Sequence, residues 1–178
     1  LLRERGYRTI HVGKGHFGPE GSDGADPSNL GFEINLAGGA IGAPGSYYGK
    51  LNYAGKGNRE RRAVPGLEAY HATATYLTEA LTIEANKLVA SAAKEGKSFF
   101  LHFAHYAVHS PFDPDPRFAA NYKSATISPD AKAFATQIEG MDKSLGDLLG
   151  QLNALGTAQT SVVVFLGGDG SDSQLGKG

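Results

Sequence analysis

The spacing of hydrophobic residues along the chain predicts two long amphipathic helices. In the first, apolar residues recur three, four or seven positions apart, which is the period of one helical face, so we expect a helix over about 67–95. The second begins after Ser128 and Pro129, residues that suit the cap and the first turn of a helix. Its apolar positions predict a helix over 130–155: Phe134, Ile138, Met141, Leu145, Leu148, Leu152 and Leu155.

Short apolar runs predict β-strands over 7–12, 98–104 and 160–166, with a further candidate over 32–36. The run over 98–104 is apolar at nearly every position, as in a strand that is covered on both faces. Strand 98–104, the second helix and strand 160–166 then form a right-handed crossover between parallel strands. The expected fold class is α/β, a mostly parallel sheet flanked by helices, in a single domain over 1–178.

Composition narrows the classes of function. A hydrophobic content of 40% allows a real core, and a formal net charge of −1 gives no global field that would attract nucleic acid or an anionic membrane surface. The sequence has no apolar run long enough for a membrane span, and its first residues lack the apolar core of a signal peptide. With no cysteine, disulfides and thiolate chemistry are excluded, and the compartment stays open.

Each of three expected strands is followed by a polar loop. The loop sequences are GKGHFG after strand 7–12, HYAVHSP after strand 98–104 and GGDGSD after strand 160–166. Ligands of parallel sheets bind outside the carboxyl ends of the strands, so these loops are expected to converge on one site for an anion and a metal ion. The candidates are Lys14, His16, His105, His109, Asp169, Asp172 and Lys177.

Each signal also has a structural explanation. A lysine in a glycine turn is usually a solvated charge, and GGDG is usually a turn. We interpret His102, His11 and His71 as hydrogen-bonded core residues rather than ligands.

Taken together and in this order, the segments resemble the sulfatase family of the alkaline phosphatase superfamily. GYRTIHVGKGHFG is similar to the family signature GYxTxxxGKWHLG, and GFEINLAGGAIGAPGSYYGK is similar to the glycine-rich segment that follows it in many bacterial members. FFLHFAHYAVHSPF resembles the family's strand and PHTPF-like loop, and VVVFLGGDGSDSQLGKG resembles its FLGDNGSD metal segment with the GKG beyond. The resemblance implies a partial alkaline-phosphatase-like sulfatase fold over essentially the whole chain.

The resemblance also implies roles for individual residues. Lys14 and His16 would approach the sulfate and the hydrated formylglycine nucleophile, His109 would contact the ester, and Lys177 would bind a sulfate oxygen. Asp169 would be a metal ligand. These roles suit sulfuryl transfer, because cations and a divalent ion stabilise the charge that develops on the oxygens.

The sequence departs from the family pattern at three points. It contains no [C/S]-x-P-x-R string, from which the family makes formylglycine. Gly168 replaces a carboxylate ligand, so we expect the Ca²⁺ or Mg²⁺ of a complete family member to bind this chain weakly or not at all, since calcium takes six to eight oxygen ligands. Gly15 stands in place of a tryptophan and is expected to loosen the loop that carries Lys14 and His16.

These observations predict the central part of a sulfuric ester hydrolase that acts on a small sulfate ester or a sulfated sugar, with the chain on its own inactive. Two alternatives remain open, a noncatalytic anion-binding remnant and a phosphate or phosphonate monoester hydrolase of the same superfamily. Self-association through an exposed sheet edge is a further alternative. Family members are often periplasmic or secreted, but the sequence itself assigns no compartment.

Overall fold

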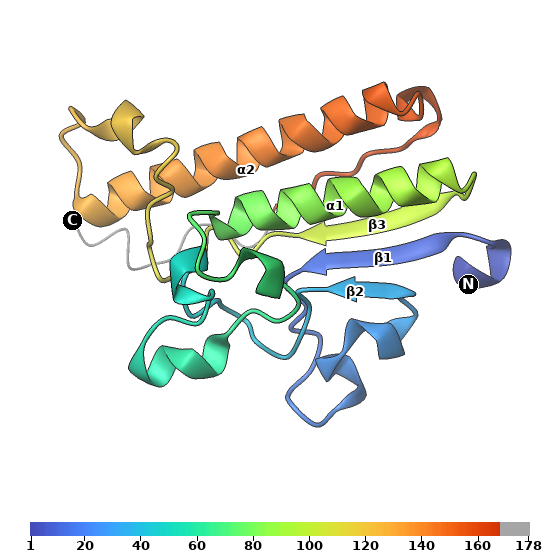
Figure 1. Ribbon diagram of the computed structural model, residues 1–178, viewed down its shortest axis with the longest axis horizontal. Coiled ribbons are helices and arrows are strands. Elements are labelled where there is room, and N and C mark those ends of the chain that lie inside the picture. The colour runs from blue at the N-terminus through green and yellow to red at the C-terminus, as the bar shows by residue number, and fades with distance from the viewer. Residues whose placement is uncertain (168–178) are drawn as a thin grey trace.

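A parallel sheet and two long helices organise residues 1–167, which are the residues described by the computed structural model (Figure 1). The sheet order is β2-β1-β3, and both pairings are parallel, which confirms the predicted α/β class. The strands and long helices are β1 (Arg8–Gly13), β2 (Ile34–Leu36), α1 (Leu77–Lys94), β3 (Phe99–Ala104) and α2 (Pro129–Ala154). The connections hold short 3-10 helices, η1 (Arg3–Arg5), η2 (Asp23–Ala25), η3 (Pro27–Leu30), η4 (Gly49–Leu51), η5 (Gly57–Arg62), η6 (Glu68–Tyr70), η7 (Ala119–Tyr122) and η8 (Ala158–Thr160).

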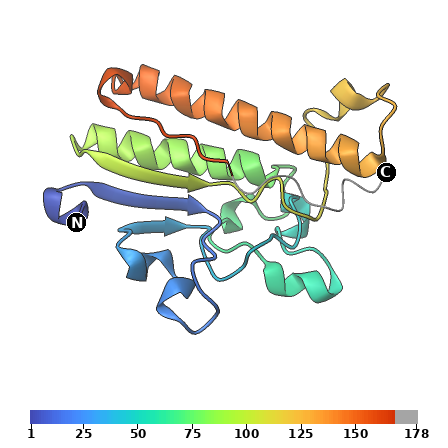
Figure 2. The same ribbon diagram turned by 180° about the vertical axis from the view of Figure 1, so that it is seen from behind.

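The core lies between α1 and the sheet. Ile10 and Val12 of β1 are fully buried, and they pack in one cluster with Leu77 and Leu81 of α1. Helix α1 covers one face of the sheet, and helix α2 packs alongside α1, beyond the β3 edge of the sheet (Figures 1 and 2). Because side chains alternate along a strand, His11 of β1 lies on the sheet face turned away from α1.

Four buried tyrosines attach the long connections to this core. Each hydroxyl donates a hydrogen bond to a backbone carbonyl, as buried phenols must to avoid an unsatisfied polar group. The tyrosines and their acceptors are Tyr47 to Tyr106 and His109, Tyr53 to Thr75, Tyr76 to Asp113, and Tyr106 to Ala37. These bonds fix loops that would otherwise carry free carbonyls.

Helix α1 begins at Leu77, so the predicted start near residue 67 is wrong. Leu67 is buried in the core, but it reaches the core from a turn, which is why the apolar spacing continued into this segment. Ala72 has a left-handed backbone with φ of 59°, which no α-helix contains. The hydroxyl of Thr73 donates to the carbonyl of Tyr70 at 2.7 Å and so competes with helical hydrogen bonding.

Helix α2 has its predicted extent, and the Ser128 hydroxyl accepts from the Ala131 N–H at 3.2 Å as the expected cap. Its buried face differs from the predicted apolar stripe, however. The buried residues are Ala133, Thr136, Gln137, Gly140, Ser144 and Leu152, whereas Ile138 of the predicted stripe is 46% exposed. Part of this buried face contacts the loop before η7, where Thr136 accepts from the Asp115 N–H and Gly140 lies against Asp115, while Ser144 is hydrogen-bonded to Thr82 of α1.

The predicted strand over 160–166 is not formed. Residues 161–167 carry no strand hydrogen bonding, and Val162 and Leu166 are 90% and 83% exposed. The prediction that β3 is covered on both faces is also wrong, because Phe100 is 41% exposed. A β-branched run becomes a strand only where a neighbouring backbone pairs with it, and β3 pairs with β1 alone among the described strands.

Among the described helices, none combines the length and the apolar character needed to cross a membrane.

Candidate functional site

The candidate site lies at the carboxyl ends of β1 and β3, two adjacent parallel strands. Lys14 and His16 directly follow β1, and His109 lies in the loop after β3. The ends meet closely, because the Lys14 N–H donates to the carbonyl of Ala104 at 2.8 Å. Two of the three predicted loops are thus adjacent. The third loop falls on residues 168–178, so Lys177, Asp169 and Asp172 lie outside the described residues.

Glycine is required at the end of β1. Gly13 has φ of 100°, and a Cβ at this position would overlap the carbonyl oxygen of Ala104. The peptide between Gly13 and Lys14 is held at both ends, since its N–H bonds to Ala104 and its carbonyl lies 3.0 Å from Nε2 of His11. The chain therefore leaves the sheet in a fixed direction at Lys14.

The glycine-rich segment 38–42 packs against the Lys14–His16 loop. A Cβ on Gly42 would come within 2.7 Å of the His16 ring, and the His16 N–H donates to the carbonyl of Gly39 at 2.7 Å. His16 itself has a left-handed backbone with φ of 54°, which this contact helps to hold. Residues without side chains thus let the two backbones lie against each other.

Gly15 belongs to the same contact. A Cβ there would come within 2.9 Å of the backbone of Gly39, so the replacement of tryptophan by glycine allows close packing. The loosening expected of this loop stays a prediction. Sequence reasoning identified the density of glycine here but not its purpose.

His109 is exposed, and its position is set by the backbone. The buried hydroxyl of Tyr47 lies 2.9 Å from the carbonyl of Tyr106 and 2.8 Å from that of His109, so it spans the loop. Burial raises the pKa of Tyr47, so the phenol stays protonated and remains a donor. The Tyr47 ring is fully buried, and it anchors the His109 loop.

His105 belongs to the helix contact rather than to the site. Its Nε2 lies 2.9 Å from the hydroxyl of Ser144, which lies 2.6 Å from the hydroxyl of Thr82. Thr82 donates its one proton to the carbonyl of Thr78 at 2.6 Å, so Ser144 must donate to Thr82 and His105 must donate to Ser144. A histidine in the donor state cannot deprotonate the serine, so this pair is no activated nucleophile.

His11 and His102 are hydrogen-bonded to each other, with their Nδ1 atoms 2.9 Å apart, which confirms their interpretation as satisfied interior residues. The same interpretation is wrong for His71, whose buried Nε2 has no hydrogen-bond partner among residues 1–167. Of the imidazoles in the segment HFAHYAVH, only His109 lies exposed at the site.

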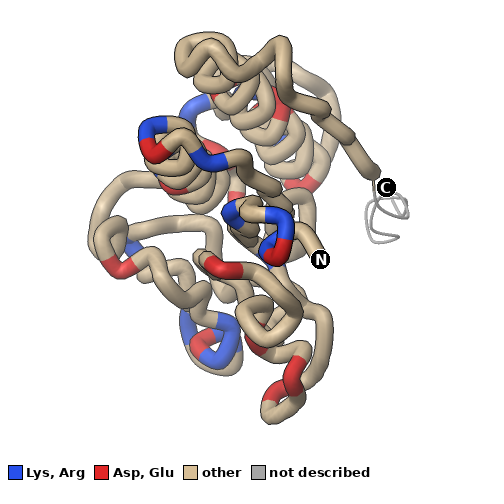
Figure 3. Tube along the Cα trace, turned by 90° about the vertical axis from the view of Figure 1, so that its right-hand side faces the viewer, with Lys and Arg blue, Asp and Glu red and all other residues tan. Residues whose placement is uncertain are grey.

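Charge is distributed in small mixed groups along the chain, so recognition of an anion must be local (Figure 3). Within residues 1–167, the ammonium group of Lys14 makes no ion pair, although Lys14 is partly buried. Its positive charge is therefore uncompensated by any described carboxylate within bonding distance.

The described residues do not supply a metal site. Within 1–167, no three His, Asp or Glu side chains are grouped to hold an ion. The predicted ligand Asp169 lies outside this range.

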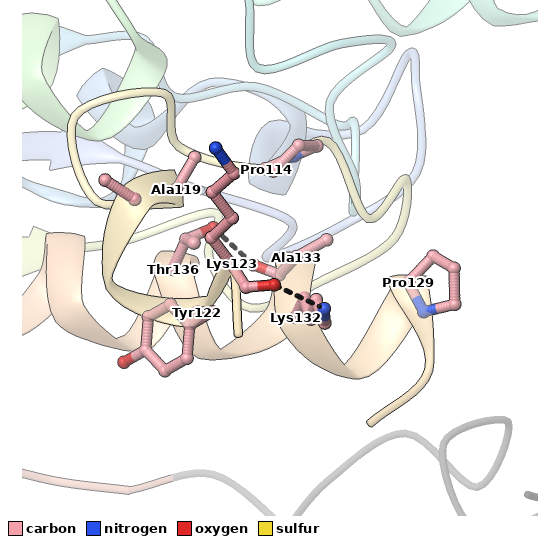
Figure 4. Close-up of a pocket in the computed structure, with 9 residues that line it drawn as sticks. Pro114, Ala119, Tyr122, Lys123, Pro129, Lys132, Ala133 and Thr136 are labelled. Carbon is pink, nitrogen blue, oxygen red and sulfur yellow. Dashed lines mark hydrogen bonds between the residues drawn. The ribbon is translucent and has the colours of Figure 1, made fainter. Parts of the chain in front are cut away.

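A separate hollow of about 470 Å³ lies between η7 and the first turns of α2 (Figure 4). Its lining is mainly apolar, with Pro114, Ala119, Pro129 and Ala133 and the side chain of Tyr122. None of the predicted site residues lines it, so it is distinct from the strand-end site.

Comparisons with known proteins agree on one family. A family model described as Sulfatase matches residues 1–177. Arylsulfatase J from Mus musculus is 26% identical over 183 residues, which cover 98% of this chain and 29% of that protein.

Solved structures agree on the fold. Ps i-CgsB, crystallised in complex with k-i-k-neocarrahexaose, matches with a TM-score of 0.66 and 23% identity, over 88% of this chain and 36% of its own. The PsFucS1 sulfatase from Pseudoalteromonas sp. matches with a TM-score of 0.57 and 21% identity, over 88% and 34% respectively. The predicted alkaline-phosphatase-like fold is confirmed, and the chain spans about a third of the length of these proteins.

Proposed function

Because this chain belongs to the sulfatase family, we propose that it forms the sulfate-binding part of a sulfuric ester hydrolase. The hydrolysis would take place in a protein that also carries a formylglycine nucleophile, which this sequence does not encode. For the chain on its own we expect binding of sulfate without turnover.

One observation carries the proposal. Lys14 and His16 follow the same strand end that the Ala104 carbonyl fixes, and the loop of His109 leaves the sheet beside them. A cation and two imidazoles are thereby supplied to one edge of a parallel sheet, which is where such folds bind their ligands.

The chemistry of sulfate transfer assigns a task to each residue. The ammonium of Lys14 would neutralise charge on the sulfate oxygens, and it would do so more strongly in the transition state as charge develops there. His16 would face the nucleophile, and His109 would contact the bridging oxygen of the ester, where a proton is needed when the alcohol leaves. Lys177 would add a second cation to the sulfate.

The substrate proposed is a sulfated sugar or a small sulfate ester. The crystallised relative in complex with a neocarrahexaose supports a sugar as the group that bears the sulfate. The match to sulfatases supports sulfate over phosphate or phosphonate as the anion. Asp169 and ligands from beyond this chain would hold Ca²⁺ or Mg²⁺ in the complete protein.

The test uses the full-length protein that contains this chain and a [C/S]-x-P-x-R segment. Sulfate release is measured with an aryl sulfate, a sulfated oligosaccharide and the matching aryl phosphate. We expect Lys14→Ala and His109→Ala each to reduce kcat/KM for sulfate release by about 10²–10³, the usual cost of one lost contact to a developing oxyanion.

Lys94→Ala is the matched control, because Lys94 is an exposed lysine at the end of α1, beside the amino ends of the strands. Full activity in this variant, together with loss in the two site variants, supports the proposal. Full activity in Lys14→Ala and His109→Ala would overturn the assignment, and faster hydrolysis of the phosphate would replace sulfate with phosphate as the substrate.

A further inference from the structure

A pair of histidines adjoins the candidate site, and none of the steps above uses it. His11 and His102 are direct partners in the parallel register of β1 and β3, with ring centroids 5.1 Å apart at an interplanar angle of 26°. Phe17 and Phe32 pack against both rings. His11 has no exposed surface, so its ring nitrogens must be satisfied within the protein.

The hydrogen bonds determine where the protons lie. Nε2 of His11 is 3.0 Å from the carbonyl oxygen of Gly13, which can only accept, so this nitrogen carries a proton. Burial lowers the pKa of His102, and it lowers that of His11 to about 4, so both rings are neutral near pH 7. Nδ1 of His11 must then accept, and the Nδ1 of His102, 2.9 Å away, must donate.

The direction of donation therefore runs from His102 to His11 and from His11 to the Gly13 carbonyl. That carbonyl belongs to the peptide whose N–H, on Lys14, donates to Ala104 at 2.8 Å. Both polar groups of this peptide are therefore hydrogen-bonded. Its N–H donates to the Ala104 carbonyl of β3, and its oxygen accepts from His11 of the histidine pair. Its plane sets the direction in which the Lys14 side chain departs.

We propose that His102 and His11 are positioning residues that act in sequence through the Gly13 carbonyl to hold Lys14 in its anion-binding orientation. The effect on anion binding rests on the proposed role of Lys14, whereas the effect on the peptide does not. His102 makes no contact with the anion and acts only through its hydrogen bond to Nδ1 of His11, which holds that ring against the Gly13 carbonyl.

Two substitutions of His102 separate this role from simple packing. His102→Leu removes the donor and leaves the buried Nδ1 of His11 without a partner, so the His11 ring is no longer held from that side and its hydrogen bond to the Gly13 carbonyl weakens. His102→Asn places an amide N–H near the former Nδ1 and preserves the donor. Both variants remove the imidazole ring, so a loss that arises from packing alone would appear in both.

The rate of amide hydrogen exchange at Lys14 measures how firmly its peptide is held. The Arg8 amide, in the same pair of strands, serves as the reference. The Arg8 N–H donates to Ser98 at 2.9 Å at the opposite end of the β1–β3 ladder. In full-length His102→Leu we expect exchange at Lys14 to accelerate about tenfold relative to Arg8, the effect of losing one hydrogen bond. His102→Asn should keep the wild-type ratio. An unchanged ratio in the leucine variant, or an equal increase at both amides, would overturn the proposal.

Ring nitrogen correlations in ¹⁵N-histidine-labelled protein give a second reading near pH 7. The proton of His102 is expected on Nδ1 and that of His11 on Nε2, and the reverse assignment would overturn the proposal. Titration with inorganic sulfate should show binding that is about fivefold weaker in His102→Leu than in His102→Asn. If the wild-type protein bound no sulfate, the proposed function would fail, while the exchange ratio would still decide whether the pair holds the peptide.

Discussion

His105 should make the protein lose stability in acid, because its neutral, donating state is built into the contact between α1 and α2. Burial lowers the pKa of this imidazole to about 4, against an ordinary value near 6.5. The unfolded chain therefore takes up a proton at His105 before the folded protein does. The stabilising contribution is complete above about pH 6.5 and is lost as the pH falls from there towards 4.

The magnitude follows from the two pKa values. Between pH 7 and pH 5, a histidine that titrates at about 4 when folded and at about 6.5 when unfolded lowers the free energy of unfolding by about 2 kcal/mol. Other groups add to the total, among them His11, whose pKa is also lowered to about 4. The contribution of His105 must therefore be isolated by a difference between two proteins.

His105→Gln provides that difference. The glutamine amide can donate to Ser144 from a position near that of Nε2, and it does not titrate. Urea denaturation followed by circular dichroism at pH 7, 6 and 5 gives the free energy of unfolding of each protein. We expect the wild type to lose about 2 kcal/mol more than the variant over this range.

If the free energy of unfolding fell by the same amount in both proteins, the conclusion that His105 is neutral in the folded protein would be refuted. If the glutamine variant failed to fold, the ring resonances of His105 in the wild type would provide the same test. An inflection near pH 6.5 in the folded protein would contradict the reasoning, and titration near pH 4 would support it.

Two further perturbations test the connections. Tyr47→Phe removes the hydroxyl that bridges the carbonyls of Tyr106 and His109, so we expect a loss of about 1–3 kcal/mol in urea denaturation and faster amide exchange near His109, with Tyr7→Phe, at an exposed tyrosine, as control. Val163→Lys interrupts the exposed apolar segment 161–167, so sedimentation of the chain at rising concentration should show less self-association than the wild type, and undiminished association would place the contact elsewhere.

Local chemistry made much of the fold predictable. Ser128 predicted the start of α2, and the short apolar run over 7–12 predicted the strand β1, because caps and such runs depend on neighbours in sequence. The start of α1 was not predictable in this way, since Leu67 is buried from a turn and periodicity records which residues are apolar rather than what backbone carries them. The same limit applies to Ile138, which is apolar but exposed, and to segment 161–167, which is apolar but pairs with no described strand.

The histidines of HFAHYAVH show why clustering in sequence predicted the site only in part. Strand alternation sends His102 to the sheet face that holds His11, and the end of β3 directs His105 into the helix contact. Both rings are neutral near pH 7 because burial lowers their pKa, and the network around His105 uses its Nε2 as a donor, so neither is available as an acid or a base at the sheet edge. Only His109 extends beyond the strand to the edge where Lys14 lies. The position of each imidazole relative to the end of β3 therefore matters more than the density of histidine, and among these three only His109 is exposed where the proposed function needs an imidazole.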